Sequence, residues 1–183
     1  MNEDITTVEA FDAMIRDSSQ GGQVLEFIGG EVVEAPGNAY LSALATHIQV
    51  ALGTFLKGKN WGHLTGESRL YQVAGERYAP DVACISKSSQ PELNGEGAIP
   101  VPPELAVEIV ADEMNAQEQR HLRIKTSNYL SAGSLVWVVC PVSQVVEVHQ
   151  PRQPVQIIDK SGTVDGGNVL PGFTLDVRTI FSE

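Results

Sequence analysis

The chain has 183 residues, 42% of them apolar, which suits one globular domain over residues 1–183 with a sizeable core. Its 23 acidic and 12 basic residues give a formal net charge of -11, whereas proteins that hold duplex nucleic acid normally present a basic face. The charge therefore counts against tight DNA binding by a monomer, unless a local basic strip or a divalent metal ion offsets it.

The chain carries no pattern typical of export or membrane insertion. Its N-terminus is acidic and lacks an apolar signal segment. The longest clean apolar run, residues 135–140, is far shorter than the roughly 20 residues of a membrane helix. We therefore expect a soluble, cytoplasmic protein with no membrane partner. Cys84 and Cys140 lie in predicted strands without CxxC spacing, so we interpret them as small core residues.

A helix and a β-hairpin are expected first along the chain. Apolar residues at helical spacing predict an amphipathic helix from about Thr6, and the polar and glycine residues 18–22 end it. Gly29-Gly30 then separates two short strands, residues 24–28 and 31–33, and is a good two-residue hairpin signal.

The next predicted helix follows the chain break at residues 36–38 and ends near Gly58. Its apolar stripe, which we expect to face the core, consists of Leu41, Leu44, Ile48, Leu52 and Phe55. A strand over residues 63–73 and a turn around Gly75 lead to a strand that includes Asp81 and ends at Ser86, and we expect the two strands to pair.

Residues 87–103 are too rich in proline and glycine for regular structure. A connection of this length is usually functional or mobile, and it is a candidate flap beside the site discussed below. In residues 103–110, alternating side chains make both faces of a predicted strand apolar except at Glu108. An ionised carboxylate without a partner is costly in such surroundings, so Glu108 should hold a metal, pair with a cation or have a raised pKa.

The second half of the chain completes a mixed pattern of helices and strands. Asn115 with Glu118 three residues later is a variant of the capping box and predicts a helix to about Ser131. Strands over residues 135–139 and 145–149 and a final meander follow. This order predicts an α/β fold with a mixed central sheet.

Two residues elsewhere are candidate partners of Glu108. Asp81 supplies a second carboxylate, and Lys125 supplies an amine from the helix after Glu108. Lys125 lies at the flank of that helix's apolar stripe and has no acidic residue three or four positions away, so an ordinary helical ion pair does not explain it.

With this triad the sequence resembles the Uma-type endonucleases of the PD-(D/E)XK nuclease superfamily. The resemblance covers nearly the whole chain and rests on short motifs in family order: Gly30-Glu31, Pro80-Asp81-Val82, Val107-Glu108-Ile109-Val110, Lys125 four residues before Tyr129, Ala132-Gly133, Trp137-Val138-Val139 with Pro141, and Leu170-Pro171-Gly172-Phe173. It implies a restriction-endonuclease-like fold with helices flanking a mixed sheet, hydrolysis of DNA phosphodiester bonds with Mg²⁺ or Mn²⁺, and a homodimer.

The resemblance also implies roles for individual residues. Asp81, Glu108 and the backbone carbonyl of Ile109 would bind the metal, and Lys125 would orient or deprotonate the attacking water. Glu67 is a weaker candidate for a second metal or the water shell. On this basis Lys125→Ala is expected to abolish cleavage while leaving the fold and much of the metal binding intact.

The chain departs from the family pattern at two positions. Val110 stands where the superfamily usually has its lysine, two residues after Glu108, and the resemblance moves the amine to Lys125. Tyr40 stands where a helix histidine is expected. The four histidines show no zinc-ligand spacing, and nucleotide-binding and serine-hydrolase motifs are absent from the sequence.

Each assignment has a structural alternative. Asp81 after Pro80 is also typical of a turn that caps a strand. Glu108 and Lys125 would equally form a buried ion pair without catalysis, and Lys125 alone would suit a surface position. The net charge and Val110 leave a second function open, a catalytically inactive nuclease-fold module that binds or regulates a partner.

Overall fold

The computed structural model describes residues 7–17, 23–93, 95 and 97–182. Its elements are α1 (Val8–Asp17), β1 (Leu25–Ile28), β2 (Glu31–Glu34), α2 (Ala39–Leu56), β3 (Gly62–Gly66), β4 (Tyr71–Val73), β5 (Glu76–Tyr78), β6 (Val82–Ser86), β7 (Leu105–Ile109), α3 (Ala116–Ser131), β8 (Leu135–Cys140), β9 (Val145–His149), β10 (Gln156–Ile158), β11 (Thr163–Gly166), β12 (Leu170–Asp176) and α4 (Val177–Ile180).

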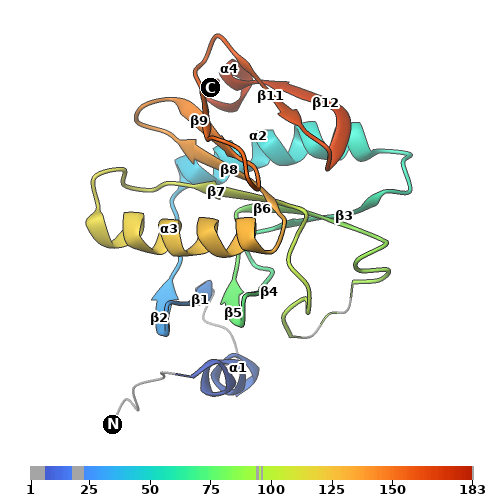
Figure 1. Ribbon diagram of the computed structural model, residues 1–183. Coiled ribbons are helices and arrows are strands. Elements are labelled where there is room, and N and C mark those ends of the chain that lie inside the picture. Colours follow the sequence, from blue (N-terminus) through green and yellow to red (C-terminus); the bar gives the residue numbers. More distant parts are fainter. Residues whose placement is uncertain (1–6, 18–22, 94, 96, 183) are drawn as a thin grey trace.

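A six-stranded sheet in the order β10-β9-β8-β7-β6-β3 forms the middle of the molecule (Figure 1). Helix α2 and the C-terminal elements pack on one face of this sheet. Helix α3 and a four-stranded sheet in the order β2-β1-β5-β4 pack on the other. Strands β7 and β8 are parallel and the other pairs are antiparallel, so the predicted mixed central sheet flanked by helices is confirmed.

Local signals predicted several elements correctly. Gly29 and Gly30 both have positive φ, 60° and 82°, as a tight hairpin turn between β1 and β2 requires. The side chain of Asn38 accepts a hydrogen bond from the Leu41 N–H and begins α2, and Asn115 caps α3 in the same way. The predicted end of the first helix, residues 18–22, lies outside the described residues.

Helix α2 is long and apolar enough, by length and composition only, to cross a membrane, with 18 residues and a mean hydropathy of 1.3. Its inner stripe packs into the core against the central sheet, where Leu44, Ile48 and Leu52 are almost fully buried. The helix therefore supplies the apolar layer that one face of the sheet needs.

The prediction of one strand over residues 63–73 is wrong. A turn at Glu67 and Ser68 divides the segment into β3 and β4, which belong to different sheets. β3 pairs with β6, as expected of the first half, whereas β4 forms a hairpin with β5 around Ala74 and Gly75. The sequence pattern indicated extended backbone on both sides of the turn but not the change of sheet.

The flap hypothesis for residues 87–103 is also wrong. This connection leaves β6 at Ser86 and enters β7 at Leu105, whereas Asp81 and Glu108 lie toward the other ends of these strands, about 16 Å from Ser86 and about 10 Å from Leu105. Its middle is fixed on β4, because Ile99 exchanges backbone hydrogen bonds with Leu70 and Gln72 and is fully buried.

Helix α1 is held to the small sheet by an ion pair between a buried arginine and a half-buried aspartate. Arg77 on β5, whose side chain is 9% exposed, donates to both carboxylate oxygens of Asp12, at 2.9 and 2.7 Å. Asp12→Ala leaves the guanidinium without this partner, so we expect it to lower the free energy of unfolding by about 2–4 kcal/mol. Urea titration measures the change. Glu9→Ala, at an exposed position on the same helix, is the control, and an equal effect of the two substitutions would contradict this account.

Candidate active site

The register of β6 and β7 brings Asp81 and Glu108 together. Val82 is the partner of Val107, and the same antiparallel register continued by one residue sets Asp81 opposite Glu108. Just before β6 begins at Val82, Asp81 Oδ2 accepts a hydrogen bond from the backbone N–H of Ile109 at 2.6 Å. The Asp81 side chain thus continues the ladder by one residue ahead of the backbone of β6.

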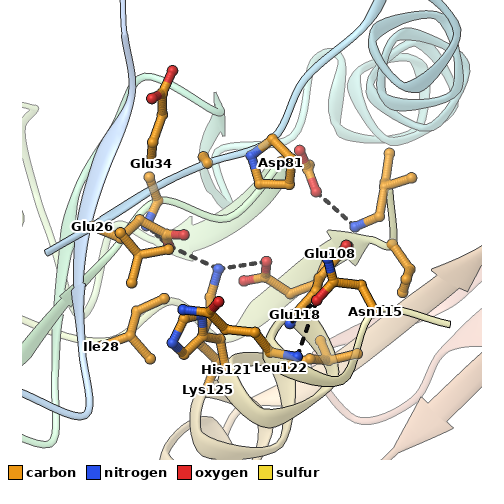
Figure 2. Close-up of a pocket in the computed structure, with 17 residues that line it drawn as sticks. Glu26, Ile28, Glu34, Asp81, Glu108, Asn115, Glu118, His121, Leu122 and Lys125 are labelled. Carbon is orange, nitrogen blue, oxygen red and sulfur yellow. Dashed lines mark hydrogen bonds and ion pairs between the residues drawn. The ribbon is translucent and has the colours of Figure 1, made fainter. Parts of the chain in front are cut away.

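Lys125 reaches this pair from α3. Its Nζ lies 2.6 Å from Glu108 Oε2 and 2.8 Å from Glu26 Oε1, and Figure 2 shows it between the two carboxylates. One turn later on the same face of α3, the hydroxyl of Tyr129 donates to Glu108 Oε1 at 3.0 Å. All three members of the predicted triad therefore line one site, although their roles stay predictions.

Glu26 is a site residue that the sequence analysis missed. It lies on β1, is 4% exposed and accepts hydrogen bonds from Lys125 and from the backbone N–H of Ala79, at 2.7 Å from the latter. The signal was available, because Glu26 interrupts an apolar strand just as Glu108 does. Nothing local, however, indicates that β1 lies beside α3.

These groups lie in a hollow of about 310 Å³ between the β1–β2 hairpin, the N-terminal half of α3 and the ends of β6 and β7. Its acidic lining consists of Glu26, Glu34, Asp81, Glu108 and Glu118. Its apolar lining consists of Ile28, Val33, Ala35, Pro36, Ala79, Ile109, Val110 and Leu122. The hollow therefore combines a charged cluster with apolar walls.

The charges at the centre of the hollow do not balance. Three carboxylates, Glu26, Asp81 and Glu108, face one ammonium, that of Lys125, which leaves a charge of about -2 if all are ionised. Burial raises the pKa of Glu108, and the negative charges of Glu26 and Asp81 raise it further against the opposing effect of Lys125. Burial also raises the pKa of Asp81 to about 6.

For Lys125 the site favours the charged form, whereas for Asp81 and Glu108 it favours the neutral form. Burial by itself would lower the pKa of its ammonium, but the charges of Glu108 and Glu26 and their hydrogen bonds outweigh burial and hold the pKa above its usual value. Lys125 is therefore a protonated hydrogen-bond donor at neutral pH and not a base.

The donor chemistry of the cluster suits a hard divalent cation. Within the part of the chain that the structure describes, no group of three acidic, histidine or cysteine side chains is arranged to hold a metal ion. Mg²⁺ does not need one, since it is usually held by one or two carboxylates and keeps several waters. Asp81 and Glu108, in a cluster with excess negative charge, fit that requirement.

Two residues singled out in the sequence lie outside the hollow. Glu67 lies exposed in the turn after β3 and does not line the hollow, although its charge contributes to the raised pKa of Asp81. Tyr40 is 46% exposed and also lies outside the lining. Glu118, in contrast, accepts hydrogen bonds from the N–H groups of Ala111 and Asp112 and fixes the loop between β7 and α3.

Comparison with known proteins gives two findings. The family model described as "Uma2: Putative restriction endonuclease" matches residues 8–178. The chain is also similar to a crystal structure described as a "putative nuclease belonging to DUF820" from Anabaena variabilis, with a TM-score of 0.80 and 16% identity over 96% of this chain and 97% of that chain. At this identity the likeness shows the fold alone. No curated protein matches the chain.

Proposed function

Because the chain belongs to the Uma2 family, we propose that it is a nuclease that hydrolyses DNA phosphodiester bonds with Mg²⁺ or Mn²⁺. The observation that carries this proposal is the convergence of Asp81, Glu108 and Lys125 in one hollow. The family assignment confirms the resemblance seen in the sequence.

Asp81, Glu108 and the backbone carbonyl of Ile109 would hold the metal ion. When bound, the ion stabilises charge on the phosphate and makes a bound water more acidic. Asp81 is suited to this task because one oxygen, Oδ2, is fixed by the Ile109 N–H, which orients the carboxylate. Glu108 is fixed in turn by Tyr129 and Lys125.

Lys125 would orient the water or a phosphate oxygen. An ammonium group has three N–H donors, and Glu108 and Glu26 together use two of them. The third is left for a group that enters the hollow. Because its pKa is raised, Lys125 would act as a positioning and charge-stabilising donor, and not as the base that removes a proton from water.

We propose one domain over residues 1–183, a homodimer and a cytoplasmic location, none of which the geometry of a single chain tests. The alternative function, an inactive module of the same fold, is favoured by one observation, the closed ion pair of Lys125 with both carboxylates.

Metal titration separates the two functions. In calorimetry with Mg²⁺ or Mn²⁺ we expect a binding heat that Asp81→Asn or Glu108→Gln each removes, and metal-dependent nicking of plasmid DNA that the same variants lose. Glu92→Gln, in the connection at the far end of β6, is a matched control that keeps both. Glu67→Gln tests whether Glu67 contributes to a second metal site, in which case it should lower the binding heat or the rate of nicking. Absence of a metal heat in the unmodified protein would favour the inactive module.

A further inference from the structure

The groups that would carry the chemistry lie at the bottom of the hollow and not on an open surface. Glu108 is 7% exposed and Lys125 is 5% exposed. Side chains of the β1–β2 hairpin and of the N-terminal half of α3 surround them (Figure 2). A scissile phosphate must therefore enter the hollow before it contacts these two residues.

The hollow is small in comparison with duplex DNA. Its volume of about 310 Å³ lies near the lower end of ligand pockets. Space of this order suits a single nucleotide inserted from the open side of the hollow.

The lining of the hollow matches the parts of a nucleotide. The Lys125 ammonium, together with a divalent cation held by the acidic cluster, would suit a phosphate. The apolar side chains, among them Ile28, Val33 and Leu122, suit the face of a base or sugar. The remaining acids of the lining, Glu34 and Glu118, repel phosphates that are not neutralised. A duplex carries about one negative charge per 1.7 Å of its axis and a single strand about one per 3.4 Å, so this lining repels a duplex more strongly than a single strand.

We propose that the hollow takes one unpaired nucleotide, so that the substrate is single-stranded DNA or a position at which a nucleotide leaves the stack, and not intact duplex. This inference rests on the proposed nuclease function. It limits the substrate class of the same site. Unstacking is least costly for a base that is already unpaired, which favours single strands and bulges.

Three substrates of one sequence test the proposal: a labelled single strand, its perfect duplex, and a duplex with one bulged nucleotide. With Mg²⁺ present, we expect the single strand and the bulged duplex to be cleaved at least about tenfold faster than the perfect duplex. The faster of the two identifies the source of the unpaired nucleotide. Fluorescence anisotropy of the same DNAs gives a binding readout that does not depend on cleavage. A perfect duplex cleaved or bound as well as the single strand would overturn the proposal.

A second test of the proposal fills part of the hollow with a larger side chain. Val33→Trp is expected to slow single-strand cleavage at least about tenfold, with little effect on hydrolysis of the small diester methyl 4-nitrophenyl phosphate, which needs less space. Ala35→Trp, on a partly exposed part of the same wall, replaces it if Val33→Trp does not fold. Val50→Trp on α2, 63% exposed and on the other side of the central sheet, is the control.

The outcomes distinguish this inference from the function on which it rests. Unchanged single-strand cleavage and binding by a folded narrowing variant would overturn the inference alone. Failure of the unmodified protein to hydrolyse either the small diester or any DNA would refute the proposed nuclease function. In that case, anisotropy still decides whether single strands bind better than duplex.

Discussion

Replacing Lys125 with methionine is expected to lower the rate of cleavage by about 100-fold or more, the usual effect of removing one aimed donor from a site. It is also expected to lower the free energy of unfolding by about 3–5 kcal/mol, because Glu26 and Glu108 then remain buried without their shared cation. The expectation from sequence, that Lys125→Ala leaves the fold intact, stays a prediction, to which the structure adds this loss of stability.

A double variant separates the two effects. Glu26→Gln removes one of the two carboxylates that Lys125 holds and keeps the side chain's size and its oxygen for the Ala79 N–H. Lys125→Met with Glu26→Gln should therefore recover part of the lost stability, as a non-additive energy in a double-mutant cycle. Cleavage should not return, because the donor is still missing.

Urea unfolding and cleavage rates per folded molecule check this prediction. A double variant that regains both stability and cleavage would show that Lys125 only holds the fold together. That result would favour the buried ion pair without catalysis over the role proposed here.

The sequence alone was sufficient for features that depend on neighbouring residues. The Gly29-Gly30 turn and the Asn38 and Asn115 caps each involve contacts within a few residues, so local chemistry determines them. The same holds for Glu108, because the apolar residues around it on both faces of β7 predicted a buried carboxylate.

Features that depend on long-range pairing were beyond the sequence. Glu26 contacts Lys125 across 99 positions, and only the packing of the small sheet against α3 brings them together. The register that sets Asp81 opposite Glu108 is likewise a property of two strands separated by a long connection. The family resemblance named Asp81 and Lys125 without this geometry, and it did not name Glu26.

Asp81→Asn is expected to abolish cleavage and, in metal-free protein, to stabilise the fold. The cause is the raised pKa of Asp81, about 6 in the folded chain against an ordinary 3.8, which means that folding disfavours the ionised form. Asparagine carries no charge and keeps an oxygen for the Ile109 N–H. We expect a loss of cleavage of about 100-fold or more, since a metal ligand is removed.

The pH dependence follows from the sign of the shift. Below pH 3.8 Asp81 is protonated in both the folded and the unfolded chain and costs no stability. As the pH rises through 3.8 and then 6, the unfolded chain loses this proton first, so the metal-free protein becomes less stable, by at most about 3 kcal/mol and about 1–2 kcal/mol after screening by water in the hollow. Asp81→Asn avoids this loss. It should therefore be the more stable chain at pH 8 and not at pH 4.

Thermal melts at pH 4 and pH 8, with and without Mg²⁺, test both halves of the prediction. Added Mg²⁺ should stabilise the unmodified protein at pH 8 by mass action and leave Asp81→Asn unchanged. If Asp81 were a turn residue that caps β6, its replacement would instead destabilise the metal-free protein at both pH values, because the carboxylate would then stabilise the folded chain. A stabilising substitution that removes activity is expected where a protein maintains an unbalanced charge for a bound cation.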